Sequence, residues 1–199
     1  MNTMNAAHRI TAIDPGTKKS AIVVMQGLSV IEKGKLDNAE LLHHLTHNRS
    51  FVGDHLYIEK IANYGMRVGQ EIFDTCIWIG EFKNAALSML PADKISLVYR
   101  MAVKMHLCGR ANAKDADIRM RIIDIYGGKE NGIGNKKNPG PLYGVKADEW
   151  AALALGLTAQ NLPITATSGW PTCCNRDMSF LPDVQQYHCP VCQSHLIKK

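Results

Sequence analysis

Long apolar runs and secretion signals are missing from this chain of 199 residues. No hydrophobic segment approaches the roughly 20 residues that a membrane-spanning helix needs. The N-terminal part of the chain lacks the basic start, the apolar block and the small-residue cleavage site of a signal peptide. We therefore expect a soluble cytoplasmic protein with no membrane partner.

A strong net charge is also missing, because the formal charge at pH 7 is only +5. The basic residues are nevertheless unevenly placed. They gather in two stretches, one with Arg100, Lys104, Arg110 and Lys114 and the other with Lys129, Lys136, Lys137 and Lys146. Such clusters favour contact with an anionic partner such as nucleic acid, and a solvated basic face is the alternative interpretation.

Cysteine is scarce in the main part of the chain, where Cys76 and Cys108 stand alone in apolar surroundings. The other four cysteines crowd into the tail. In a reducing cytosol this crowding indicates a metal site rather than disulfides. With 46% apolar residues, the chain can bury one ordinary core and carry a small appendage. We expect a main domain at residues 1–158, a linker at 159–169 and a separate tail at 170–199.

Hydrophobic periodicity predicts an α/β layered main domain. Three strands form an antiparallel meander, a helix capped by Asn38 returns over the sheet, and a further strand, a long helix, another strand and two helices follow. The expected strands are residues 9–14, 20–25, 29–36, 55–59 and 94–99, and the later helices are 68–90, 100–107, 114–126 and one that begins near 146.

Two segments of this pattern stand out. The 68–90 helix is apolar on more than one side, so it is either enclosed in the core or shared with a second subunit, and we expect Ile79 to take part in a dimer. Residues 127–144 contain many glycines and prolines and are expected to form a long loop without regular structure. Loops of this length in compact domains are usually functional or disordered.

Acidic residues occupy three special places. Asp14 ends the first apolar strand at an Asp-Pro-Gly turn, Glu59 shares a strand face with Tyr57, and Asp148 with Glu149 opens the last helix of the main domain. Each position has a structural alternative, since Asp before Pro-Gly is ordinary turn chemistry and acids stabilise a helix N-terminus.

Carboxylates that converge on one point repel each other unless cations are bound between them. Their hard oxygen ligands select Mg²⁺ or Mn²⁺. Two such ions roughly 4 Å apart can activate a water on one side of a phosphodiester and stabilise the leaving oxygen on the other. The three acidic positions therefore predict a metal-dependent phosphodiesterase.

Three motifs carry a family resemblance. Ile-Asp14-Pro-Gly-Thr, Tyr-Ile-Glu59 and Ala-Asp148-Glu149-Trp-Ala-Ala-Leu-Ala, in this order, resemble the RuvC-type Holliday junction resolvases of the RNase H-like superfamily, in particular their bacteriophage branch. The resemblance implies a five-stranded mixed sheet flanked by helices, a homodimer with two active sites, and paired nicks across a four-way DNA junction. If the gene is phage-encoded, the protein acts in the cytoplasm of a bacterial host.

The same resemblance assigns roles to the acids. Asp14, Glu59 and Asp148 would hold two Mg²⁺ or Mn²⁺ ions in each active site. RuvC relatives commonly have an acid or histidine one helical turn before the last aspartate, where this chain has Val145. Glu149 is a candidate for that duty, although neighbouring residues on a helix point about 100° apart.

Tyr64 lies in a loop where RuvC relatives carry an aromatic residue that stacks on opened bases, and covering the edge of the core is its alternative role. The residues expected to contact the DNA backbone are Arg67, Lys104, Lys114, Lys136, Lys137 and Lys146.

The tail carries Cys173-Cys174 and Cys189-Pro-Val-Cys192, with 14 residues between Cys174 and Cys189. Four thiolates at this spacing predict a zinc ribbon with a structural Zn²⁺ that supplies the folding energy of so short a segment. His188 and His195 are reserve ligands, so the fourth zinc ligand stays open.

Other functions remain possible for the main domain. It can be another RNase H-like nuclease that acts on forks, flaps or RNA:DNA hybrids. It can also be a junction-binding module without catalysis, an alternative favoured by the presence of Val145 where RuvC relatives have an acid or histidine. Asp-Pro-Gly-Thr also resembles the phosphate-binding turn of actin-like and sugar-kinase-like ATPases, but the chain is too short for their two domains.

Overall fold

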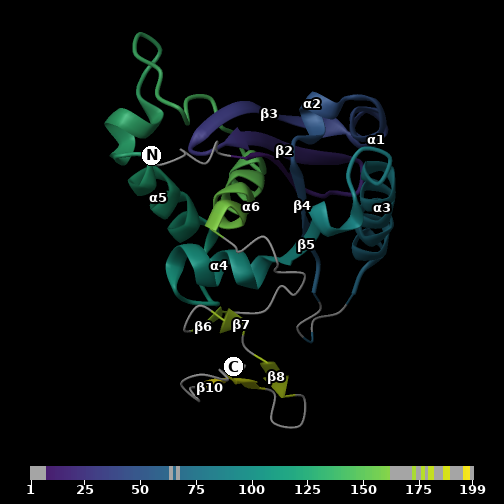
Figure 1. Ribbon diagram of the computed structural model, residues 1–199. Coiled ribbons are helices and arrows are strands. Elements are labelled where there is room, and N and C mark those ends of the chain that lie inside the picture. The colour runs from purple at the N-terminus through teal and green to yellow at the C-terminus, as the bar shows by residue number, and fades with distance from the viewer. Residues whose placement is uncertain are drawn as a thin grey trace, which may run out of the picture.

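The computed structural model describes residues 8–62, 65 and 68–161, together with the backbone of five short strands in the tail. A single five-stranded sheet, with helices packed against both faces, forms the main part of the molecule (Figure 1). Among the described residues, no helix combines the length and apolar character needed to cross a membrane.

The sheet has the strand order β3-β2-β1-β4-β5. β1 to β3 form an antiparallel meander, whereas β4 runs parallel to β1 and β5 parallel to β4. The strands are β1 (Arg9–Asp14), β2 (Lys19–Gln26), β3 (Ser29–Asp37), β4 (His55–Lys60) and β5 (Ile95–Tyr99). The predicted five-stranded mixed sheet is therefore confirmed.

Helices cover the two faces of the sheet unequally. α1 (Asn38–His47) and α3 (Gln70–Ala86) pack together on one face, and α4 (Arg100–Cys108), α5 (Asp115–Ile125) and α6 (Glu149–Asn161) cover the other. Because parallel strands need crossover connections, α1 with the short α2 (Arg49–Val52) joins β1's meander to β4, and α3 joins β4 to β5. The short helix α2 was not predicted.

α6 lies flat on the sheet because its contacting residues are small. Ala152 and Ala154 are fully buried, and at Gly156 an added Cβ would stand only 2.6 Å from the sulfur of Met25 in β2. The missing side chain allows the helix backbone to approach the strand closely. The helix continues to Asn161, and Ala159 is buried, so the first residues of the predicted linker belong to α6.

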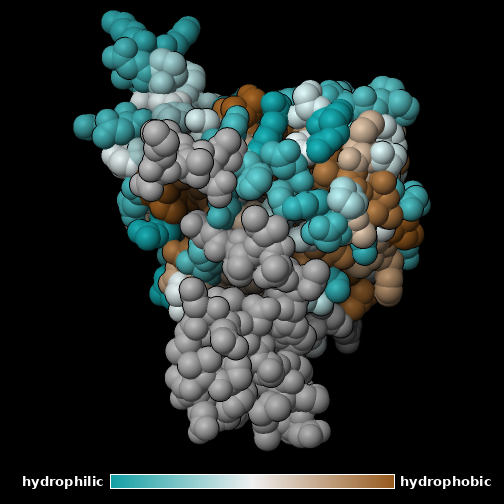
Figure 2. Space-filling model, viewed as in Figure 1, coloured by the Kyte–Doolittle hydropathy of each residue, from teal (hydrophilic) through white to brown (hydrophobic). Residues whose placement is uncertain are grey.

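α3 presents one stripe to the core and another to the outside. Thr75, Ile79 and Phe82 are buried, whereas Phe73 is 56% and Ile77 is 62% exposed. The expectation that Ile79 takes part in a subunit contact is wrong, because this side chain packs in the core of its own chain. Apolar side chains do gather on the outer side of α3 (Figure 2).

Two further expectations need correction. Asn38 does not cap α1: the helix begins at this residue, and its buried side chain turns toward the β1–β2 connection. Residues 127–144 are not wholly irregular, because Lys129–Ile133 forms a short π-helix, η2.

An arm that begins with η2 projects from the α5 side of the molecule (Figure 1). We use this name for residues 129–143. Gly134 and Pro139 form an isolated antiparallel bridge, and the side chain of Asn135 accepts hydrogen bonds from the backbone N–H groups of Lys137 and Asn138 at 2.9 and 3.0 Å. Leu142 at its base is buried in the core. The arm is therefore a folded hairpin.

Candidate metal and nucleic-acid site

Asp14 and Glu59 meet because of the sheet register. Ile13 of β1 is paired with Ile58 of β4 in the parallel ladder, so Asp14 and Glu59 are the next residues along neighbouring strands. Side chains alternate along a strand, and both acids therefore project on the α4–α6 face while the two isoleucines point into the opposite core. This alternation was predicted for β4 and is confirmed.

The turn after Asp14 is fixed by a side-chain network. Ser20 donates a hydrogen bond to Asn38 Oδ1 at 2.7 Å, Asn38 Nδ2 donates to the carbonyl of Gly16 at 2.9 Å, and the N–H of Gly16 donates to Ser20 Oγ at 3.2 Å. A Cβ at Gly16 would collide with the carbonyl oxygen of Lys19. Asp14 is thus held at the end of a strand whose following turn is closed on itself.

Asp148 reaches the same place from the segment that leads into α6. The preceding residue, Ala147, has φ of 36°, a left-handed backbone conformation that residues other than glycine seldom adopt. Together with Asp14 and Glu59, Asp148 lines a cavity of about 280 Å³. The cavity is also lined by Arg100, Asp115, Ile118, Ala147, Trp150 and Ala151. The three predicted acids are therefore brought together.

Two basic side chains bind these carboxylates. Arg100, the first residue of α4, donates to Glu59 at 3.1 Å and to Asp115 at 2.7 Å. Lys35 of β3 forms an ion pair with Oδ2 of Asp148. The cluster thus contains four carboxylates and two cations.

The electrostatic consequence is greatest at Asp14. Burial is the largest cause that raises the pKa of Asp14 to about 7; the neighbouring carboxylates of Glu59 and Asp148 add to the rise, and the charges of Arg100 and Lys35 oppose it. Burial also raises the pKa of Glu59, against the opposing charge and hydrogen bond of Arg100. The neighbouring basic side chains therefore do not fully neutralise the two carboxylates. A bound cation would stabilise their ionised forms.

The donor set fits a hard divalent cation, since four carboxylates share one cavity. In the described part of the chain, no three histidine, cysteine, aspartate or glutamate side chains yet stand close enough to enclose a metal ion. Arg100 and Lys35 are bound to two of the carboxylates that would have to converge. A cation bound here would compete with Arg100 for Glu59 and with Lys35 for Asp148.

Glu149 is turned away from the cluster. Its Oε2 accepts a hydrogen bond from the backbone N–H of Lys146 at 2.9 Å, and the N–H of Glu149 donates to the carbonyl of Lys146 at 2.8 Å. These two hydrogen bonds close the turn that leads into α6 and hold the Glu149 carboxylate against the backbone. Val145 is buried in the core, so this position contributes no ligand.

Sequence reasoning missed three residues of the site: Lys35, which pairs with Asp148, Arg100, which pairs with Glu59, and Asp115. Asp115 begins α5 and was assigned only to a helix, although it is a fourth carboxylate in the cavity. Lys35 is in register with Ala21, which is in register with Asp14, so the three residues form one row across β3, β2 and β1. The alternation of Lys33 and Lys35 on β3 was the available signal for this row.

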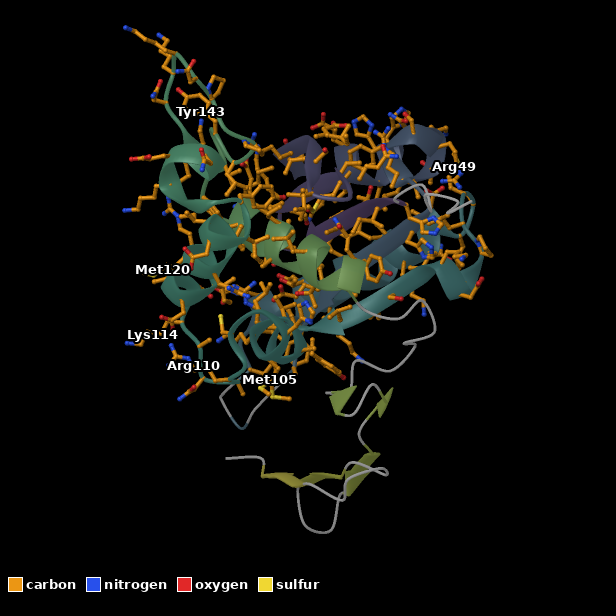
Figure 3. The ribbon with its side chains drawn as sticks, turned by 60° about the vertical axis from the view of Figure 1, so that its left-hand side comes forward. Arg49, Met105, Arg110, Lys114, Met120 and Tyr143 are labelled. Carbon is orange, nitrogen blue, oxygen red and sulfur yellow. The ribbon has the colours of Figure 1, made fainter. Side chains whose placement is uncertain are left out.

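The basic residues predicted to bind DNA lie on several different elements, and none of those that the structure describes lines the cavity. Lys104 lies one turn after Arg100 and its charge lowers the pKa of Glu59. Lys114 precedes α5 and extends outward near Arg110 (Figure 3). Lys136, Lys137 and Lys146 are exposed, the first two near the tip of the arm. Tyr64 and Arg67 lie outside the described residues.

The predicted zinc ligands are not described as side chains. Cys174, Cys189 and Cys192 lie outside the described residues, and Cys173 is described by its backbone alone. In the tail, β6 (Thr172–Cys173) pairs with β7 (Arg176–Asp177), and β9 (Gln186–His188) pairs with β8 (Ser179–Leu181) and β10 (His195–Ile197). The zinc ribbon stays a prediction.

Comparison with known proteins gives a result at the level of structure. No protein-family model matches the sequence, and no curated protein matches it. Two solved structures are similar: RuvC of Thermus thermophilus, with 19% identity, and T. thermophilus RuvC in complex with a Holliday junction substrate, with 18% identity. Both have a TM-score of 0.53 and 92% of their chain covered, over 75% and 76% of this chain. The chain therefore has a RuvC-like fold.

Proposed function

We propose that this chain is a divalent-metal-dependent, structure-selective DNA endonuclease that resolves four-way junctions by paired symmetric nicks. The observation that carries the proposal is the cavity in which Asp14, Glu59 and Asp148 meet on a RuvC-like fold. The complex of T. thermophilus RuvC with a Holliday junction supports branched DNA as the substrate class.

In this proposal Asp14, Glu59 and Asp148 hold two Mg²⁺ or Mn²⁺ ions, which supply an activated water and stabilise the leaving oxygen. The chain contributes the rigid placement of these acids. Asp14 is fixed by the Ser20, Asn38 and Gly16 network, Glu59 lies near the end of β4 between β1 and β5, and Asp148 directly precedes α6. The carboxylate of Glu149 is bound by the backbone N–H of Lys146, and we assign Asp115 instead as the fourth carboxylate near the phosphate.

Basic residues outside the cavity would bind the DNA backbone. The arm is tied to the edge strand of the sheet, because Lys33 Nζ donates to the carbonyl of Tyr143 at 2.9 Å. Its tip is hydrophilic and carries Lys136 and Lys137 (Figure 2). We assign these two lysines, with Lys104, Lys114 and Lys146, to phosphate contacts, and Tyr64 and Arg67 to contacts at the branch point. Removing both tip lysines should lower the slope of log Kd against log salt by about two.

Paired nicks require two active sites, and we assign the outer side of α3 to a homodimer interface. Phe73 and Ile77 lie one helical turn apart on this side and are more than half exposed, with Cys76 beside them. Large exposed apolar side chains that cluster in this way mark an interaction surface. Sedimentation equilibrium of the wild type and of a Phe73→Glu, Ile77→Glu variant tests the assignment: a dimer should become a monomer, and a monomeric wild type contradicts it.

The substrate assay uses labelled four-way junctions, replication forks, flaps and RNA:DNA hybrids with Mg²⁺ or Mn²⁺. We expect two symmetric nicks in the junction, each with a 5′ phosphate and a 3′ hydroxyl. Preferred cleavage of forks, flaps or hybrids would instead identify another RNase H-like nuclease. Tight junction binding without any cleavage would identify the non-catalytic module that the buried Val145 suggests.

For the tail we retain the proposal of a structural Zn²⁺ bound by Cys173, Cys174, Cys189 and Cys192. The segment between β9 and β10 contains the second pair of cysteines, and the first pair begins at the end of β6. Metal analysis of the purified chain should find one zinc per polypeptide, and its absence after purification without chelator would contradict the site.

A further inference from the structure

Lys35 occupies a position in which it can exchange one anionic partner for another. Its ammonium group binds Asp148, one of the carboxylates that the proposed function gives to the metal ions. The side chain is 46% exposed, so it is free to turn toward solvent. Among described residues, Asp148 is the carboxylate bonded to this ammonium group.

The sheet explains how a residue of the edge strand reaches the site. Lys35 is in register with Ala21 of β2, and Ala21 is in register with Asp14 of β1. The three residues therefore share the α4–α6 face. Because the middle residue is alanine, with a small side chain, the long stem of Lys35 can pass over it toward the carboxylates. Strand register, not loop conformation, brings the cation to Asp148.

An ammonium group and a divalent cation compete for the same carboxylate. Both are positive, so they repel each other when they bind one small group, and the repulsion is greater in a partly buried cavity than in water. A metal ion that binds Asp148 therefore weakens its ion pair with Lys35, and the released ammonium group is then beside the cavity in which the proposed function places the phosphodiester. A lysine is suited to this change because its flexible stem carries a compact charge.

Arg100 differs from Lys35 in the number of carboxylates that it binds. It is bonded to two carboxylates, Glu59 at 3.1 Å and Asp115 at 2.7 Å. It can release Glu59 while Asp115 still holds it. Lys35, with Asp148 as its carboxylate partner, has to find another anion.

We propose that Lys35 is an exchangeable counter-ion: it neutralises Asp148 before metal binding, and when a divalent cation takes Asp148 it becomes a ligand of the DNA backbone phosphate. Metal and DNA then bind cooperatively: the metal ion releases Lys35 from Asp148, and the DNA phosphate gives the released ammonium group a new anionic partner. This inference rests on the proposed nuclease function, and it assigns Lys35 to the binding of the scissile strand.

The chain offers a matched control in Lys33. It lies two residues away on the same strand and the same face, but its ammonium group binds the carbonyl of Tyr143 and no carboxylate of the cluster. Lys33→Met and Lys35→Met thus remove the same charge from neighbouring positions. Lys35→Arg keeps the charge and provides a test of rescue.

The first measurement uses electron paramagnetic resonance to follow the binding of Mn²⁺ to the 199-residue chain in the absence of DNA. Lys35→Met should bind Mn²⁺ about three- to tenfold more tightly than the wild type, because the competing cation is gone. Lys33→Met and Lys35→Arg should stay near the wild-type affinity. Asp148→Asn identifies the signal of this site by weakening it. An unchanged or weaker Mn²⁺ affinity in Lys35→Met overturns the proposal.

The second measurement is the affinity for a four-way junction in EDTA and in Ca²⁺ as a function of salt. If Lys35 binds phosphate when a divalent cation is present, Lys35→Met should lower the slope of log Kd against log salt by about one in Ca²⁺ and by less in EDTA. Equal slopes in Ca²⁺ for Lys35→Met and the wild type overturn the phosphate role. A wild type that binds no branched DNA contradicts the proposed function instead, and the Mn²⁺ result separates the two failures.

Discussion

The two faces of the sheet use the same strands for opposite purposes. On the α1–α3 face, β1 and β4 present Ile13 and Ile58, which are fully buried among apolar side chains. One residue further along each strand, Asp14 and Glu59 project from the other face into a cavity with two cations and two more carboxylates. Stability and chemistry are therefore separated by a single step along the strand, and a substitution at one position should leave the other function intact.

The largest contrast should be between Glu59→Gln and Ile58→Ala. Glu59→Gln removes a carboxylate that the proposed function assigns to the metal ions, so nicking of a four-way junction should fall on the order of 10³-fold while the fold persists. Ile58→Ala deletes fully buried methyl groups and should lower the free energy of unfolding by about 3 kcal/mol, with the nicking rate per folded molecule unchanged.

Rates from junction cleavage and unfolding midpoints in urea check both halves of this contrast. The separation of the two faces would be refuted if Ile58→Ala lost cleavage without losing stability, or if Glu59→Gln cut the junction at the wild-type rate. Junction affinity of Glu59→Gln should be unchanged or higher, because a negative charge near phosphate is removed.

A smaller effect should appear in the pH dependence of stability without divalent metal. The pKa of Asp14 is about 7 in the folded chain, against 3.8 for an unperturbed aspartate, so the folded state binds more protons than the unfolded state between these values. Stability contributed by this residue is therefore lost as the pH rises from about 4 to 7. Asp14→Asn should gain roughly 2 kcal/mol over the wild type at pH 8 and little at pH 4.

Urea unfolding in EDTA at pH 4 and pH 8 measures this difference. Asp37→Asn is a suitable comparison, because Asp37 is an exposed carboxylate paired with Lys19 at 3.2 Å and should change stability by less than about 0.5 kcal/mol at either pH. If Asp14→Asn were no more stable than Asp37→Asn at pH 8, the raised pKa of Asp14 in the folded chain would be excluded.

The sequence was sufficient for the strands and for the meeting of the acids. Apolar periodicity located each strand of the sheet, and the alternation of Tyr57, Ile58 and Glu59 placed Glu59 on the correct face. These features depend on local spacing along the chain, which a single sequence displays directly.

The partners of the acids could not be predicted in the same way. Lys35 meets Asp148 through the register of three strands, and Asp115 reaches the cavity through the packing of α5. Both depend on contacts between distant segments. Glu149 stands three residues after Lys146, and its carboxylate accepts from the Lys146 N–H in the turn before α6, a contact that the residue types alone do not signal.

Ile79 and Asn38 show a third kind of limit. The apolar pattern of α3 is continuous around much of the helix, and only the packing of α3 on the sheet decides that Ile79 lies inside and Ile77 outside. Asn38 begins α1, as its residue type favours, but its side chain serves the turn that follows Asp14. A preference for helix starts does not say which neighbouring donors and acceptors the side chain will choose.

Gly156 has a consequence that reaches well beyond its own contact with Met25. Because Gly156 has no side chain, the backbone of α6 packs directly against Met25 of β2 at this point. This close packing also fixes how near the first turn of α6 lies to the sheet. A methyl group at this position, about two helical turns from Asp148, would push α6 away from the sheet and shift Asp148 with it. The absence of a Cβ atom at Gly156 thus helps to set the distance of Asp148 from Asp14 and Glu59.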